Sequence, residues 1–337
     1  MGDLNQRFVK ATVFALYALC VLTSSSFDPE DAYGLEPSFR FQNSFWVNLH
    51  ATLRGEARRR SLSLAAQIDV TGLADAERKT WSSALDAYQD YGRRNVIFDE
   101  TLVHLNNWLS TVPDEGQLSP IPSDIEASAV RALVDAAPVY RAHFWPDQSQ
   151  RNVKWIAAVK PLVVVLGSNM ASSLAAIYRV DWPAAPVVVD ASFEAGADGG
   201  YTTEGPMGTA AHTVIQASNI GYQGDAGFEM LFHEACHAEA IEQSLREAIN
   251  REAARQNVKV ASDLWHTIIF YTAGELARRE LEKNGHANYQ PYAYRNGLWD
   301  RGWQTLRDAL ESDWKPYLDG RATFDSAMQA LVRDTSR

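Results

Sequence analysis

The sequence predicts a mostly helical α+β fold with a small antiparallel or mixed sheet. Long stretches rich in Ala, Leu, Glu, Gln and Arg, with apolar residues at helical spacing, fill most of the chain. Two short runs rich in β-branched residues, 185–192 and 212–218, are typical of strands. The 337 residues, 46% of them apolar, suffice for one large domain or two lobes.

The first half of the chain carries the helical pattern with few interruptions. Residues 27–44 are turn-rich and predict a tail. The predicted helices cover 45–59, 75–92, 97–110, 123–144 and 148–179. The last of these is expected to break near Gly167, and Pro113 and Pro120 mark the main loop. We therefore expect residues 27–180 to form a helical N-terminal lobe.

The pattern changes after Trp182. A strand over 185–192 is followed by a glycine-rich turn or hairpin over 196–208, and a second strand covers 212–218. That strand ends at the loop before another predicted helix. We expect residues 181–337 to form a second lobe.

The charge of the chain limits its partners. The net charge is −11, and the basic residues are scattered singly or in short runs. An acidic chain without a basic stripe is a poor candidate for binding nucleic acid or an anionic membrane. We therefore expect neither partner.

The N-terminal residues have the pattern of a targeting segment. Arg7 and Lys10 precede an apolar run over 11–22 that is short for a membrane span, and small residues follow at 23–26. This predicts a signal peptide over 1–26 and a secreted or periplasmic protein, with no stable membrane association after its removal. The alternative is an N-terminal membrane anchor or a buried helix.

The segment 228–245 is predicted to be a helix and contains His-Glu-Ala-Cys-His at positions 233–237. Two histidines four residues apart lie on one helical face, so His233 and His237 can bind one metal ion. A glutamate directly after the first histidine, Glu234, then lies beside the metal and can accept a proton from water. The alternative is an amphipathic helix whose histidines are satisfied by hydrogen bonds.

The third metal ligand is sought on the predicted helix over 261–281. On a helical projection Glu275 falls within the arc of apolar residues that face the core, whereas His266 points nearly opposite. A carboxylate on an apolar face is costly unless a cation compensates it, which favours Glu275 as the ligand. One alternative is that Glu275 forms an ion pair with Arg279. Another is that His266 is the third ligand, or that it orients the metal ligands without binding the ion.

This combination resembles the gluzincin group of the zincin metallopeptidases, which bind zinc through a His-Glu-x-x-His helix and a later glutamate. Three stretches are also similar to a group of secreted bacterial proteins of unassigned activity: 45–50, 264–275 and 291–295. The first resemblance implies a zincin-like catalytic core in residues 181–337. It also implies a Zn²⁺ ion held by His233, His237 and Glu275.

The resemblance also suggests where substrate binds. The strand just before the metal helix is usually the edge strand in zincins, which implies substrate contacts at Thr213, Ile215 and Gln216. The alternative is a strand that only covers the helix. In the loop after 281, Tyr294 and Tyr292 are candidate donors to the oxygen that becomes negative during hydrolysis, unless their rings only pack the C-terminal helices.

These expectations combine into an exported zinc metallopeptidase that hydrolyses a peptide or protein substrate. Metal-activated water would attack the peptide bond, with Glu234 as the general base. One rival is a metal-dependent hydrolase of a non-peptide amide or ester. Others are a non-catalytic zinc-binding protein and a helical protein that binds no metal. The sequence does not predict the oligomeric state.

Overall fold

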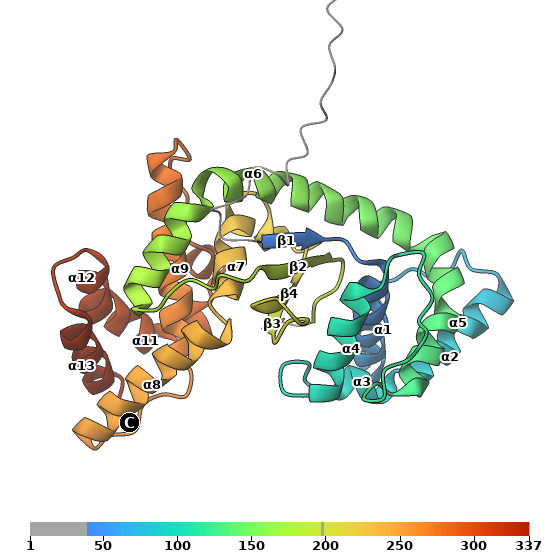
Figure 1. Ribbon diagram of the computed structural model, residues 1–337, viewed down its shortest axis with the longest axis horizontal. Helices are drawn as coiled ribbons and strands as arrows, with labels where there is room; N and C mark the ends of the chain where they lie inside the picture. The colour runs from blue at the N-terminus through green and yellow to red at the C-terminus, as the bar shows by residue number, and fades with distance from the viewer. Residues whose placement is uncertain (1–38, 197–198, 337) are drawn as a thin grey trace, which may run out of the picture. The chain divides into compact units, whose positions relative to one another are not determined.

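The computed structural model describes residues 39–196 and 199–336 and is a mostly helical α+β structure with one four-stranded mixed sheet (Figure 1). The predicted fold class is therefore confirmed. Residues 35–337 form one compact unit. The predicted signal peptide, residues 1–26, lies outside the described residues, and export stays a prediction.

The sheet has the strand order β1-β2-β4-β3. Its strands are β1 (Phe39–Gln42), β2 (Val187–Ser192), β3 (Gly200–Thr203) and β4 (Ala211–Gln216). The first three in spatial order are parallel to one another, and β3 is antiparallel to β4. The β-branched runs predicted β2 and β4, whereas β1 falls in the expected tail and β3 in the expected hairpin. β3 is therefore one edge of the sheet.

Two of the N-terminal helices begin at a residue whose side chain caps the helix. The side chain of Ser44 accepts a hydrogen bond from the Val47 amide at the start of α1, and Asp99 accepts one from Leu102 at the start of α4. The helices are α1 (Phe45–Ser61), α2 (Asp75–Ala87), α3 (Gln89–Arg93), α4 (Glu100–Thr111) and α5 (Ala127–His143). Their buried apolar faces form one core cluster, which Tyr201 of β3 and Val214 of β4 extend onto the sheet.

Of the apolar residues of helix α6 (Trp145–Tyr178), Trp145 alone packs against this cluster. The helix continues through Gly167 without the expected break, and its buried side chains pack with the C-terminal helices and the other face of the sheet. In Figure 1, α1–α5 lie on one side of the sheet, α7–α13 lie on the other, and α6 runs along both. Among the described helices, α6 alone is long and apolar enough to cross a membrane by length and composition, with 39% of that window buried.

The C-terminal helices surround the second core cluster. They are α7 (Asp225–Ala235), α8 (Glu239–Gln256), α9 (Leu264–Lys283), α10 (Tyr292–Arg295), α11 (Gln304–Ala309), α12 (Lys315–Leu318) and α13 (Phe324–Asp334). Short 3-10 turns cover Ile220–Tyr222 and Trp299–Arg301, and a π turn covers Leu310–Trp314. The predicted single helix over 228–245 is wrong, because the chain leaves the helix at 236–238 and starts α8.

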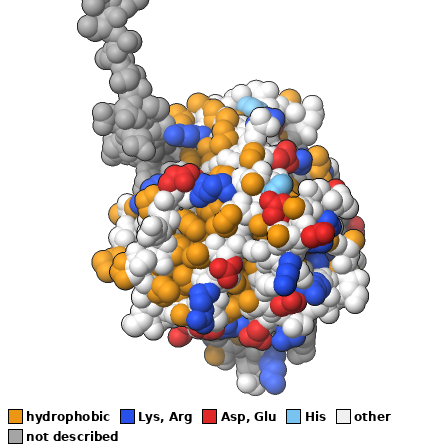
Figure 2. Space-filling model, turned by 90° about the vertical axis from the view of Figure 1, so that its right-hand side faces the viewer, with side chains coloured by type: hydrophobic (Ala, Val, Ile, Leu, Met, Phe, Trp, Pro, Cys, Tyr) orange, Lys and Arg blue, Asp and Glu red, His pale blue; other side chains and the backbone are white. Residues whose placement is uncertain are grey.

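Helices α7 and α9 pack closely against each other, which brings the segment 233–237 and the helix with the candidate third ligand close together. Gly274 of α9 has no room for a side chain, since an added Cβ would lie 2.8 Å from Pro291 and 3.1 Å from Glu229 of α7. On the face drawn in Figure 2, Lys and Arg side chains lie among Asp and Glu side chains, not in a basic stripe.

Candidate metal centre

Three histidines converge between α7 and α9. His233 is on α7, His237 lies in the turn directly after it, and His266 is on the first turn of α9. Each offers one ring nitrogen, and these nitrogens all lie within 4.8 Å of one another. The Nε2 atoms of His233 and His237 are 3.4 Å apart. Two nitrogens bound at about 2.0–2.1 Å to one tetrahedral zinc ion would be separated by about 3.4 Å.

Burial keeps two of these imidazoles, His233 and His266, uncharged. It lowers the pKa of His233 well below the ordinary value, and the nearby His237 and His266 lower it further. Burial, followed by the effect of His237, lowers the pKa of His266 to about 3. A neutral imidazole has the free lone pair that a metal ion needs. The pocket therefore holds ligands in the protonation state suited to a divalent cation.

A carboxylate on α8 orients His237. The Nδ1 atom of His237 lies 2.8 Å from Oε2 of Glu242, and the other oxygen of Glu242 accepts a 2.7 Å hydrogen bond from Arg246. The Arg246 guanidinium in turn lies 3.6 Å over the ring of Trp265. A carboxylate at Nδ1 holds the proton on that nitrogen and leaves Nε2 free to bind a metal. Glu242 is thus the counterpart of the partners that position metal-binding histidines.

The ring of His233 is held by packing. Its centroid is 3.8 Å from that of Phe270, and the two rings are nearly stacked. Its Nδ1 atom is buried and has no hydrogen-bond partner among the described residues. The orientation of this ring is therefore set by the aromatic contact on α9 rather than by a second carboxylate.

The carboxylate of Glu234 lies between α7 and the edge strand β3. Its Oε2 accepts a 2.9 Å hydrogen bond from the hydroxyl of Thr202, which is 2.8 Å from the hydroxyl of Thr213 on β4. Because Thr202 donates to Glu234, Thr213 must donate to Thr202. Gly200 leaves room for the carboxylate, since an added Cβ there would lie 2.9 Å from Oε1 of Glu234. The sheet therefore fixes the position of the candidate base.

A cavity of about 240 Å³ opens onto these groups. Its polar lining includes the three histidines, Glu234, Glu242 and Arg246. Its apolar wall includes Ile97, Phe98, Met230, Trp265 and Phe270. The strand β3 contributes Gly200, Tyr201 and Thr202. The space beside the histidines is thus bordered by one sheet edge and by aromatic rings.

The structure does not bring Glu275, the predicted third ligand, to the two histidines. Glu275 lies nine residues after His266 on α9, about 13 Å along the helix axis and on the opposite side. Its carboxylate binds three cations instead: Arg278 at 2.8 Å, Arg279 at 2.8 Å and Lys315 at 3.1 Å. The compensating positive charge that a buried glutamate requires comes from these side chains, of which Arg279 was the predicted alternative.

His266, the alternative third ligand, lies beside His233 and His237. The helical projection assumed one inward face, but α9 is buried on nearly all sides between α7 and the C-terminal helices. His266, Phe270 and Ala273 lie at i, i+4 and i+7 and form the face turned to α7. This apolar stripe was visible in the sequence and is the signal that indicates His266.

Neither predicted tyrosine lines the cavity. Tyr294 donates its hydroxyl hydrogen bond to Glu311 and belongs to the surroundings of Glu275. Tyr292 binds Glu229 through its backbone amide, at 2.9 Å from Oε2, and its ring lies behind Phe270. The surroundings of both rings agree with the alternative prediction, in which the rings pack against the C-terminal helices.

The substrate-binding strand is also placed differently from the prediction. β4 pairs with β2 on one side and β3 on the other, so it has no free edge. Thr213 and Ile215 are fully buried, and Gln216 pairs with Ser192 of β2. The edge next to the metal cavity is β3, which the sequence showed only as part of a glycine-rich segment.

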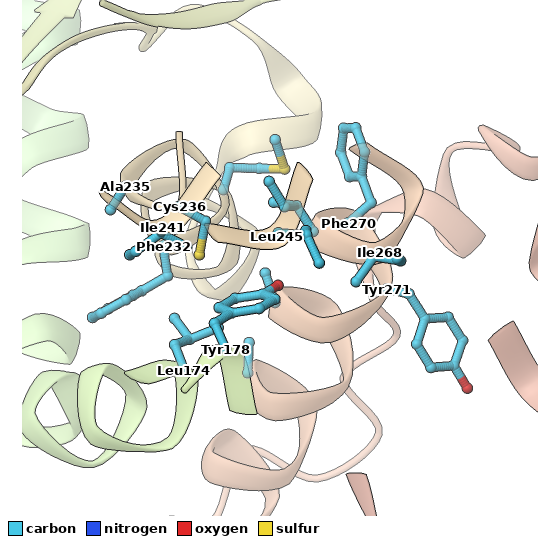
Figure 3. Close-up of a cluster of buried hydrophobic side chains, with 14 of the residues drawn as sticks. Leu174, Tyr178, Phe232, Ala235, Cys236, Ile241, Leu245, Ile268, Phe270 and Tyr271 are labelled. Carbon is cyan, nitrogen blue, oxygen red and sulfur yellow. The ribbon is translucent and has the colours of Figure 1, made fainter. Parts of the chain in front are cut away.

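Cys236 points away from the histidines into the hydrophobic core. Figure 3 shows its sulfur among the side chains of Leu174, Tyr178 and Ile241. The thiol is fully buried, and burial raises its pKa, so it stays protonated. Its surroundings are those of a core side chain.

Thr202 and Glu242 are the functional candidates that sequence reasoning missed. Thr202 acts across a strand pair that periodicity did not reveal, and Glu242 acts across the helix break after His237.

Comparisons with known proteins add no further indication: no family model matches the chain, and no curated protein or solved structure matches it significantly.

Proposed function

We propose that this chain is a zinc-dependent hydrolase of peptide bonds. Its specificity for peptides comes from the edge strand β3 beside the metal site. The observation that carries the proposal is the convergence of three histidines on one point, two of them held uncharged by burial, with the carboxylate of Glu234 beside them. Three protein ligands and one open position are the usual arrangement of catalytic zinc.

Zinc fits the donor set better than other common cations. Imidazole nitrogens suit zinc, whereas calcium and magnesium prefer oxygen ligands. The 3.4 Å separation of the two Nε2 atoms agrees with tetrahedral binding. His237 has the carboxylate partner that metal-binding histidines commonly have.

The residues around the ligands can perform hydrolysis by activated water. A zinc ion in this site would lower the pKa of a bound water molecule and polarise the carbonyl group under attack. Glu234 is next to His233 in sequence and would accept the proton of the attacking water, then pass it to the leaving amine. Thr202 would hold Oε2 of Glu234 in place through the 2.9 Å hydrogen bond.

The edge strand β3 favours a peptide as substrate. It has a partner strand on one side only, and Gly200, Tyr201 and Thr202 line the cavity. An extended peptide can bind such an edge through backbone hydrogen bonds, which would bring one of its carbonyl groups to the histidines. This assigns to β3 the role that the sequence assigned to Thr213, Ile215 and Gln216.

Hydrogen bonding without a metal explains less of the geometry. One imidazole nitrogen can donate to the other, which accounts for the contact between His233 and His237. It gives no reason for a third neutral imidazole at the same point, buried among Trp265 and Phe270. A shared cation accounts for all three rings.

The test is the variant Glu234→Gln, with zinc content and turnover of a peptide library measured together. We expect about one zinc per chain and a loss of hydrolysis by about a hundredfold or more. Glu280→Gln is the matched control. Glu280 is also buried but lies on α9, outside the lining of the metal cavity, where it accepts a hydrogen bond from Asn169. Loss of zinc, or full activity, in Glu234→Gln would contradict the assigned role.

A further inference from the structure

A second cavity, of about 340 Å³, lies beside the metal cavity and is lined by arginines. Arg54 and Arg58 come from α1, and Arg93 and Arg94 come from the end of α3. None of the described residues that line it is Asp or Glu. Such a concentration of positive charge stands out in a chain whose net charge is −11.

The packing of α3 on α1 produces this concentration. Gly92 lies directly against the α1 backbone, because an added Cβ would be 2.7 Å from the Arg58 amide and 3.1 Å from the Arg54 carbonyl. The absence of a side chain at this point brings the end of α3 up to α1. Arginines of both segments therefore line one cavity, across a helix contact that only glycine allows.

Among the described residues, two of these arginines have no ion-pair partner. Arg94 binds Asp99 through two hydrogen bonds, and Arg93 has a 3.4 Å contact with the exposed Asp90. Arg54 donates only long hydrogen bonds, of 3.3 and 3.4 Å, to backbone carbonyls. The described carboxylates form no ion pair with Arg54 or Arg58.

Arg54 is also poorly hydrated. Burial lowers the pKa of its guanidinium, although the group stays charged. Arg58, one turn further along α1, is exposed at the mouth of the cavity. A partly buried cation with long hydrogen bonds and an exposed neighbour of the same sign favours an anion between them.

The arginine cavity and the metal cavity share three lining residues. They are Ile97, Gly200 and Tyr201. Gly200 contacts Glu234 on one side and lines the arginine cavity on the other. A molecule that lies along the start of β3 can therefore reach the histidines and the arginines at once.

We infer that the arginine cavity is an oxyanion-binding subsite, which holds a carboxylate or phosphate group of the molecule that occupies the metal cavity. Arg54 and Arg58 bind the group, since guanidinium groups match both anions with paired hydrogen bonds. Anion binding itself requires no metal. The role of the subsite in substrate selection rests on the proposed hydrolase function.

Anion binding is tested by calorimetry on the metal-free double variant His233→Ala, His237→Ala, so that the outcome does not depend on the metal site. The probes are inorganic phosphate and acetate at constant ionic strength. We expect one site, whose affinity falls at least about tenfold in Arg58→Ala. The matched control is Arg60→Ala, an exposed arginine of α1 that pairs with Asp86 outside the cavity.

The two probes distinguish the sources of the anion. Tighter binding of phosphate assigns a phosphorylated ligand, and tighter binding of acetate assigns a carboxylate. Absence of binding, or equal binding by Arg58→Ala and Arg60→Ala, would overturn the inference. Failure of the hydrolase proposal is detected separately by Glu234→Gln, which leaves the arginine cavity unchanged.

Discussion

The variant Glu275→Gln separates a structural role from a metal-binding role. Glu275 is buried and bound to Arg278, Arg279 and Lys315, and these three partners lower its pKa from 4.5 to about 2 although burial alone would raise it. Because one pKa unit corresponds to about 1.4 kcal/mol, this shift is worth about 3 kcal/mol. The cations are a quarter to a third exposed, which reduces the expected loss in the free energy of unfolding to about 2 kcal/mol.

The pH dependence of this loss has a definite sign. The folded protein holds the Glu275 carboxyl at a lower pKa than the unfolded chain, so its contribution is complete above pH 4.5 and is lost as the pH falls toward 2. Urea unfolding at pH 7, 5 and 3.5 should therefore show a difference between wild type and Glu275→Gln that shrinks in acid. Zinc content should not change.

A matched control for this experiment is Glu282→Gln. Glu282 also binds Arg278, at 2.9 Å, but it is 63% exposed, and its removal should cost less than about 0.5 kcal/mol. A Glu275→Gln protein that keeps its stability but loses its zinc would refute the reasoning. That result would restore Glu275 as a metal ligand.

Three further predictions concern groups around the site. Glu242→Gln should weaken zinc binding by about 10- to 100-fold in a chelator competition, because the partner that orients His237 loses its charge. In Thr202→Val the Glu234 carboxylate loses a hydrogen-bond donor, so the pH at the midpoint of the acidic limb of the kcat/KM–pH profile should rise by about one to two units. In Thr202→Ser this midpoint should not change. Burial raises the pKa of Glu229 from 4.5 to about 7, so the folded state retains this proton and wild-type stability should fall by up to about 3 kcal/mol between pH 4.5 and 7. Glu229→Gln should lack that fall, and a parallel pH dependence of the two proteins in urea unfolding would contradict it.

The helices and two of the strands follow from local sequence patterns. Caps such as Ser44 and Asp99 mark helix starts, and the β-branched run before Ser192 marks β2. The pairing of His233 with His237 is also local, because four residues separate them. These features depend only on the residues that form them.

The third ligand and the edge strand depend on contacts between distant segments. The choice between His266 and Glu275 depends on which face of α9 meets α7, and α9 is apolar on both faces. The edge position depends on strand order, and β3 is four residues long with Gly200 at its start, too short and irregular for a periodic signal. Periodicity along one segment does not determine either result.

Zinc binding by His266→Ala tests the central claim most directly. Zinc content after dialysis, measured on wild type, His266→Ala and Glu275→Gln, compares the two candidate ligands on one helix. The three-histidine site predicts about one zinc per wild-type and Glu275→Gln chain, and affinity reduced more than about a hundredfold in His266→Ala. Full zinc content in His266→Ala would contradict the account. So would a wild-type protein that retains no zinc on dialysis after it has been loaded with zinc.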